Sequence, residues 1–422
     1  MVQAAFQPSW GRRILGLEGL RGFAATAVVV GHVHAYNANG VGWGVLSPVI
    51  FLLLNGLVMF RGLTGFLLFR PFATAIITGQ RWPSIGRYAT NRVLRLYPAY
   101  LAVLLIVSLV LGVAYTIPVE PGGVEDMDNV GYMTDPGRLL LDASLLHTLF
   151  PYSIKTGLGV SWSLSVEMLF YAVMPLIAFG VMKIRTFDPR RNVWLALIPA
   201  AVIMAIGLTG KFVRMQLLEG LPPGDEFYYD WGGNWYAVLA RSFAVHADLY
   251  AFGMIVAVIV AAFENDLLRS QLAPRFRLGA VAVALFAVGV VMPLVPPAFD
   301  RTPVAMAYSA VILFIALPDR TGSPSLTGRA LEFLPLRYVG VVSYGVFLWH
   351  VPVIWMLERY GLPDQSSAWG FVGSLVLVMA ISVGLATLTR QFIEIPALRL
   401  KRSTERVPAR VPAAPKAQPA PD

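Results

Sequence analysis

The chain contains ten stretches of about 20 mostly apolar residues, each long enough to cross the hydrocarbon core of a bilayer as a helix. Within a bilayer every backbone N–H and C=O must find a partner inside the protein, so separate spanning segments of this length are helical. The sequence therefore predicts an all-α, polytopic integral membrane protein. The expected spans are residues 19–36, 46–69, 96–116, 160–182, 192–210, 237–263, 278–295, 303–318, 337–357 and 369–391.

The composition supports a membrane protein. Hydrophobic residues make up 57% of the 422 residues and charged residues 14%, with a mean hydropathy of +0.65. Soluble domains hold about 45–50% and about 25% of these classes. The balance excludes a disordered chain, a collagen and a nucleic-acid-binding module, so the net charge of +9 reflects membrane topology instead. Because the chain has no Cys, disulfides, thiolate metal sites and covalent Cys catalysis are excluded.

The distribution of Lys and Arg predicts the orientation. With the N-terminus in the cytoplasm, the inner segments hold 24 of the 33 Lys and Arg residues and the outer segments hold six. Ten spans then place both termini in the cytoplasm.

The stretch 138–152 is short and carries Asp142 and His147, so an interfacial or re-entrant helix is expected there. We expect residues 1–400 to form the membrane-embedded domain, with a retained first span, and residues 401–422 to form a disordered Pro/Ala-rich cytoplasmic tail.

Ionisable side chains within the apolar part of the chain are candidates for function, because a charge inside a bilayer is costly. Arg21 and His32 are eleven positions apart on the first span, so they share one helix face and are separated by about 16 Å along the axis. A cation at the cytoplasmic mouth and a deeper imidazole suit a long ligand with a phosphate head, such as acyl-coenzyme A; a structural His32 is the alternative. The candidates are Arg21, His32, His34, Arg61, Asp142, His147, Glu167, Arg241, His246, Asp248 and His350.

A second group of cations precedes the third span. Arg92 and Arg95 are three positions apart and therefore project from one face of a helix. Guanidinium groups bind phosphates in a bidentate manner, so this pair suits the phosphates of coenzyme A approaching from the cytosol. The alternative is an ordinary positive-inside segment that contacts lipid headgroups.

The fourth span opens with Trp162-Ser163-Leu164-Ser165-Val166-Glu167 and so buries a carboxylate in an apolar helix. Three roles are open for Glu167: neutralising Arg61 or Arg241, orienting His32, or holding an acceptor hydroxyl. Sequence alone does not rank them.

The ninth span carries Tyr344, Trp349 and His350, which form either an interfacial aromatic belt or a polar part of the site.

The chain has no phosphate-binding P-loop, no dinucleotide-binding glycine motif, no HExxH zinc motif and no G-x-S-x-G nucleophile elbow. No metal ligand set and no bound cofactor are expected.

Together these stretches resemble membrane-bound acyltransferase family 3, the bacterial O-acyltransferases of surface glycans and some natural products. The order and spacing of the motifs, over about residues 17 to 396, carry the resemblance. They are Leu17-Glu18-Gly19-Leu20-Arg21-Gly22 with His32, Arg92-Val93-Leu94-Arg95-Leu96-Tyr97-Pro98, Trp162 to Tyr171, Ser343-Tyr344 to Pro352, and the looser Phe392-Ile393-Glu394-Ile395-Pro396.

The resemblance implies a multi-pass protein of the bacterial inner membrane that moves an acyl group, most often acetyl, from cytosolic acyl-coenzyme A to a hydroxyl of a cell-envelope glycan or glycolipid. His32 is then expected as general base or transient acyl carrier, with Glu167 as the second catalytic candidate. Arg21, Arg92 and Arg95 are expected to bind the donor. Acceptor contacts or structural polar roles are expected for Trp162, Ser165, Tyr344 and His350.

Acyl-coenzyme A is expected as a co-substrate, and the lipid bilayer and a carbohydrate or lipid-linked acceptor as partners. The resemblance does not include the hydrolase domain that is fused to some relatives, so we expect transfer to occur within the membrane domain or with a partner. Two alternatives stay open at this point. One is an acyltransferase that acts on a secondary metabolite such as a macrolide, and the other is a transporter or flippase.

Overall fold

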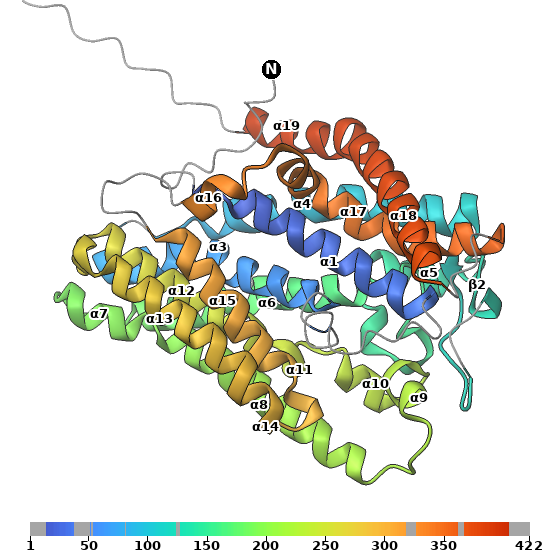
Figure 1. Cartoon of the computed structure of the whole chain (residues 1–422), viewed down its shortest axis with the longest axis horizontal. Coiled ribbons are helices and arrows are strands. Elements are labelled where there is room, and N and C mark those ends of the chain that lie inside the picture. Colours follow the sequence, from blue (N-terminus) through green and yellow to red (C-terminus); the bar gives the residue numbers. More distant parts are fainter. Residues whose placement is uncertain are drawn as a thin grey trace, which may run out of the picture.

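The chain folds almost entirely into helices (Figure 1). The computed structural model describes residues 14–37, 51, 54–80, 82–123, 127–317, 326–361 and 367–404. In these ranges the only strands are β1 (Ala114–Tyr115) and β2 (Val130–Gly131), which pair antiparallel with Ala114 opposite Gly131. The predicted all-α polytopic class is confirmed. Residues 1–13, part of the span expected at 46–69, and the tail from residue 405 lie outside the described residues.

Ten long helices form the body of the described part of the chain. They are α1 (Leu17–Asn37), α3 (Gly56–Thr78), α4 (Ile85–Leu105), α6 (Trp162–Met182), α8 (Ile198–Glu219), α12 (Asp248–Glu264), α13 (Ala273–Phe286), α15 (Arg301–Ala316), α17 (Leu334–Arg359) and α18 (Ala368–Thr389). The π-helical segments η2 (Ile106–Leu111), η7 (Ala287–Val291) and η9 (Arg390–Glu394) extend α4, α13 and α18.

Shorter elements connect these helices. They are α5 (Pro136–Ala143), α7 (Pro189–Leu195), α9 (Glu226–Trp231), α10 (Trp235–Ala240), α11 (Phe243–His246), α14 (Met292–Leu294), α16 (Leu326–Ala330) and α19 (Ile395–Thr404). The single 3-10 turns are η3 (Met127–Asn129), η4 (His147–Leu149), η5 (Pro151–Ser153), η6 (Ser270–Leu272) and η8 (Pro297–Phe299).

Within the described ranges, eight of the ten expected spans are helices long and apolar enough to cross a membrane. The other two differ for physical reasons. α1 has 21 residues, but Glu18, Arg21 and two His make it less apolar. The stretch 237–263 is not one helix, because α10 ends at Ala240 and α12, with 17 residues, begins at Asp248.

The stretch 138–152 has no helix long enough to span a bilayer. α5 has eight residues, and η4 and η5 follow it as single turns. The Asp135 carboxylate caps α5 by accepting hydrogen bonds from the backbone N–H groups of Gly137 and Arg138. This compact arrangement agrees with the expected short interfacial or re-entrant element and not with an additional span.

α1 lies between α17 and α3 near the middle of the molecule, with α18 packed on its α17 side (Figure 1). Contacts advance in the same direction along α1 and α17: Glu18 pairs with Arg337, and His32 contacts His350. The two helices are therefore parallel, as the predicted topology requires of the first and ninth spans. At their crossing, Gly22 and Gly340 bring the two backbones together, which is typical of small residues between membrane helices.

α3 and α12 form the second close pair, in which Gly65 lies against the backbone of Tyr250 and Gly253 lies against that of Gly62. α8 and α15 also pack against α12, and α13 packs against α15 (Figure 1). This subbundle positions one wall of the candidate site described below.

A side chain at the α1–α17 crossing is expected to destabilise the fold. A Cβ on Gly340 would overlap the carbonyl oxygen of Glu18, and overpacking a tight contact costs about 1–3 kcal/mol. Gly340→Ala should lower the thermal midpoint of the purified protein in detergent. Gly279→Ala on α13, where nothing lies within 4 Å of an added Cβ, is the matched control. Equal midpoints for the two variants would contradict the close packing.

Candidate active site

Four of the recognisable sequence motifs meet in space. A cavity of about 120 Å³ opens between α1, α3, α4, α6, α12 and α17. Its lining comes from the first, second, third, fourth, sixth and ninth predicted spans and from the segment just before the third, and its outermost members, Arg21 and Phe347, are 326 positions apart in the sequence. Its polar lining consists of Arg21, Arg61, Thr64, Arg92, Arg95, Ser163, Glu167, Tyr171, Tyr250, Ser343 and Tyr344.

Arg21, Arg92 and Arg95 all line this cavity, and we call them the arginine mouth because each is partly exposed. Arg21 donates to the hydroxyl of Ser343 at 3.1 Å. The guanidinium carbon of Arg92 lies 5.9 Å from the ring centroid of Tyr171. α4 begins at Ile85, capped by Ser84, so Arg92 and Arg95 lie within the helix and not at the entrance of a span that starts at residue 96. The structure thus brings together all three predicted donor-binding residues.

Glu167 faces the same cavity. Its Oε1 accepts hydrogen bonds from the hydroxyl of Thr64, at 3.3 Å, and from the hydroxyl of Tyr171. These contacts hold the carboxylate on the wall that faces the arginine mouth. Thr64 and Tyr171 were not among the expected site residues, although Tyr171 lies four positions after Glu167 and therefore on the same helix face.

His32 and His350 form a pair beyond the cavity on the α1–α17 contact. Nδ1 of His350 lies 3.1 Å from the carbonyl oxygen of Val346 and therefore donates to it, which leaves Nε2 as an acceptor in the neutral ring. Nδ1 of His32 lies 3.0 Å from the carbonyl oxygen of Val28 and 3.2 Å from Nε2 of His350. Both neighbours are acceptors, so the proton of His32 is on Nδ1 and its basic nitrogen is Nε2.

The remaining expected site residues divide into two groups. Ser165 donates to the carbonyl oxygen of Leu145 at 2.8 Å and Tyr344 donates to that of Leu96 at 2.8 Å, so both hydroxyls bridge neighbouring segments. The ring centroid of Trp162 instead lies 5.3 Å from the guanidinium carbon of Arg61 and 5.2 Å from that of Arg241. Ser343 was not assigned a role from sequence, and its adjacency to Tyr344 was the available signal.

A family model described as "Acyltransferase domain", that of acyltransferase family 3, matches residues 14–387. The chain belongs to this acyltransferase family. Together with the apolar helices, this makes it a multi-pass protein of the bacterial plasma membrane. No solved structure matches the chain.

Three curated relatives of this acyltransferase are named as peptidoglycan O-acetyltransferases or as a transacylase. "Putative peptidoglycan O-acetyltransferase YrhL" of Bacillus subtilis (strain 168) is 26% identical over 408 residues, covering 91% of this chain and 55% of the relative. "Peptidoglycan O-acetyltransferase OatA" of Listeria monocytogenes is 22% identical over 396 residues, covering 90% and 55%. "Putative membrane-bound transacylase BcsY" of Komagataeibacter xylinus is 28% identical over 388 residues, covering 87% and 79%. The aligned part of this acyltransferase spans about half the length of the first two.

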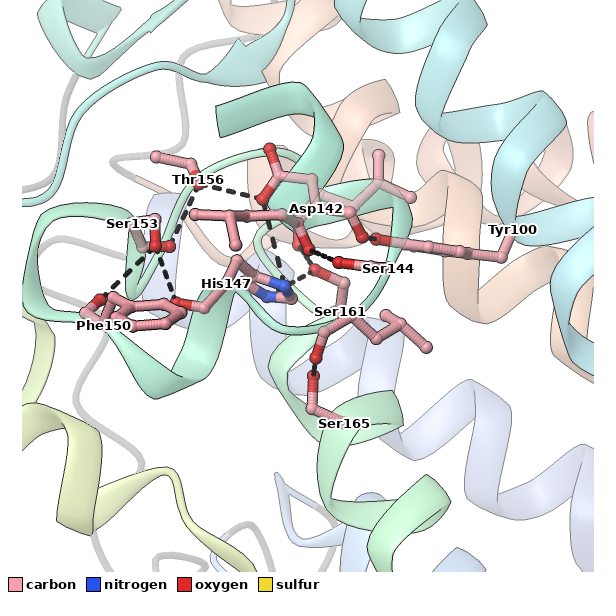
Figure 2. A network of polar contacts seen from close by, with 12 residues as sticks. Tyr100, Asp142, Ser144, His147, Phe150, Ser153, Thr156, Ser161 and Ser165 are labelled. Carbon is pink, nitrogen blue, oxygen red and sulfur yellow. Dashed lines mark hydrogen bonds and ion pairs between the residues drawn. The ribbon is translucent and has the colours of Figure 1, made fainter. Parts of the chain in front are cut away.

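A second cluster of this acyltransferase resembles a catalytic triad (Figure 2). The Oγ of Ser161 lies 3.1 Å from Nε2 of His147, and Nδ1 of His147 lies 3.9 Å from Oδ1 of Asp142. The last distance is too long for a hydrogen bond, and the three residues are 0–1% exposed. Ser161 also lies 2.6 Å from the carbonyl oxygen of Leu158, to which its hydroxyl donates. The cluster is therefore structural and anchors the segment from α5 to η5 beside the start of α6.

Asp142 and His147 lie outside the membrane-spanning segments, and both are buried. Burial raises the pKa of Asp142 from 3.8 to about 7 and lowers the pKa of His147 from 6.5 to about 3. A raised carboxyl pKa means that stability falls as pH rises from about 4 to about 7. A lowered imidazole pKa means that stability rises with pH from about 3 to about 6.5. Over the shared window the two effects oppose each other.

Removing one partner should expose the pH dependence of the other. Asp142→Asn leaves His147, so the thermal midpoint in detergent should increase between pH 4 and 6.5. The free energy of unfolding should rise by at most about 1.4 kcal/mol per pH unit over this range. His147→Gln leaves Asp142, so the midpoint should decrease over pH 4 to 7. Two variants whose slopes, each compared with the wild type, have the same sign would contradict these opposite pKa shifts.

Proposed function

We propose that this protein is a membrane O-acyltransferase that transfers an acyl group, acetyl in the simplest case, from acyl-coenzyme A to a hydroxyl of a cell-envelope glycan. The observation that carries the proposal is the gathering of Arg21, Arg92, Arg95 and Glu167 in one cavity, with the His32–His350 pair further along the same helix pair. The relatives named as peptidoglycan O-acetyltransferases favour a glycan acceptor over a secondary metabolite and over transport.

The arginine mouth provides the charge that a nucleotide donor requires. Three guanidinium groups within one cavity match the phosphates of coenzyme A, which Arg binds through paired hydrogen bonds. The cavity volume of about 120 Å³ is close to that of a site which holds one benzene-sized ligand. We therefore place only a narrow part of the donor inside, with the adenine and ribose outside on the cytosolic side.

His32 is the base in this proposal. Its Nε2 takes the proton from the acceptor hydroxyl as the oxygen attacks the thioester carbonyl, and it returns that proton to the departing thiolate. The products are an ester and free coenzyme A. His350 then acts as a positioning residue, because its Nε2 accepts the Nδ1 hydrogen of His32 in both protonation states. A transient acyl-His32 would use the same Nε2.

Loss of the imidazole should abolish most of the turnover. His32→Ala is expected to lower kcat about 10²–10⁴ fold, the usual contribution of a positioned general base, as measured by coenzyme A thiol release from acetyl-coenzyme A with a peptidoglycan acceptor. His34→Ala is the matched control, since its ring packs on Phe371 at a centroid distance of 6.4 Å. A folded His32→Ala enzyme with most of its activity would contradict the assignment. Gradient-dependent uptake without acylation would support a transporter instead.

Removing positive charge from the arginine mouth should weaken donor binding more than it slows acyl transfer. The double variant Arg92→Gln/Arg95→Gln is expected to raise KM for acetyl-coenzyme A by about tenfold or more, because two charge-assisted phosphate contacts are lost. Arg87→Gln, on the exposed first turn of the same helix, should leave KM near the wild-type value. An unchanged KM in the double variant would remove these residues from the donor site.

A further inference from the structure

Arg61 carries a charge that the mechanism above does not use. Its side chain lines the cavity from α3 and is 3% exposed. One guanidinium nitrogen, Nη1, lies 2.9 Å from Nδ1 of His246, whose Nε2 donates to the carbonyl oxygen of Ala240 at 3.1 Å. Nδ1 of His246 is therefore the acceptor, and this imidazole is neutral. Arg61 thus receives no negative charge from His246.

Arg241 is a second buried cation in the same cluster, with 5% exposure. Its guanidinium carbon lies 3.4 Å from the ring centroid of Trp231 and 5.2 Å from that of Trp162. Arg61 lies 5.3 Å from the same Trp162 ring. The ring of Trp162 therefore lies close to both cations.

Among the described residues no carboxylate forms a direct ion pair with either cation. Asp230 pairs with Arg214 at 2.7 Å and Asp248 pairs with Lys211 at 2.6 Å. In the described part of the chain Nε and Nη2 of Arg61, and Nε of Arg241, are buried without a hydrogen-bond partner. Cation–π contacts with Trp return only a fraction of the hydration that a buried guanidinium loses. A bound anion would supply the missing partner.

We propose that Arg61 and Arg241 form an anion-binding site that shares no residue with the arginine mouth and binds the carboxylate or phosphate of an anionic acceptor. The inference rests on the proposed function. It places the anion on the acceptor because all four residues lie in or just after predicted outer segments. Trp231 is within one, Arg241 and His246 directly follow it, and Trp162 follows another at the start of α6. The arginine mouth instead includes Arg92 and Arg95 from α4, which follows a predicted inner segment.

The test uses the purified full chain in detergent and the thermal midpoint as the readout, because a ligand of the native state raises it. The probes are glucuronate and glucose 6-phosphate, with glucose as the neutral control, and coenzyme A as the donor. Both anionic sugars should stabilise the wild type more than glucose does. Arg61→Gln and Arg241→Gln should each raise the apparent Kd of the two anionic sugars by about tenfold or more, while the Kd of coenzyme A stays within about twofold of the wild-type value.

Arg70→Gln is the matched control, because it removes the same charge from α3 at a residue that pairs with Glu264 away from the cavity. It should retain the response to the anionic sugars. If Arg61→Gln does not fold, Arg61→Lys keeps the charge but loses the planar fork, and it should also weaken the two anions relative to coenzyme A.

Two results would overturn the proposal. Anionic sugars that stabilise the wild type no more than glucose, or equally well in the wild type and both variants, would show that no acceptor oxyanion binds there. A selective loss of coenzyme A binding in Arg61→Gln would assign the cation to the donor. Coenzyme A release by the wild type is measured separately, so a failure of the proposed acyltransferase reaction is distinguishable from a failure of this site.

Discussion

The close contact of α1 with α17 is the constraint on which the candidate site depends. Gly22 and Gly340 let the two backbones approach where any side chain would overlap a carbonyl oxygen. That approach brings the hydroxyl of Ser343 to Arg21 and the ring of His350 to His32. In a bilayer, helix association depends on such close packing and on interhelical hydrogen bonds and not on hydrophobic burial. Packing and function therefore use the same helix pair.

Electrostatics divides the polar interior into groups with different physical consequences. Lys211 and Asp248 pair with each other, and the hydroxyl of Thr302 also donates to Asp248, so their charges are compensated. The cavity has one carboxylate, Glu167, among four arginines in its described lining. A buried excess of positive charge is unfavourable for folding, and a protein that keeps one is typically prepared for an anionic ligand. Both proposals follow from this excess.

Sequence reasoning predicted the parts of the site that lie on single helices. The eleven-residue spacing of Arg21 and His32, and the three-residue spacing of Arg92 and Arg95, specify faces by helical periodicity alone. It did not predict His350 as the partner of His32, because that contact depends on which two helices pack together. The break between α10 and α12 was also missed, since residues 237–263 are mostly apolar and their mean hydropathy does not register that α10 ends just before Arg241.

The Asp142–His147–Ser161 cluster shows why residue identity does not establish chemistry. Its spacing resembles a nucleophilic triad, yet the cluster is sealed, the carboxylate is too distant to orient the imidazole by a hydrogen bond, and the Ser161 hydroxyl serves a backbone carbonyl. Its contribution is to position α6. Ser161 directly precedes this helix, and Ser165 is tied to Leu145. The start of α6 presents Trp162 to the two cations and, five residues later, Glu167 to the cavity, so the segment that precedes α6 positions one helix to contribute to both parts of the site.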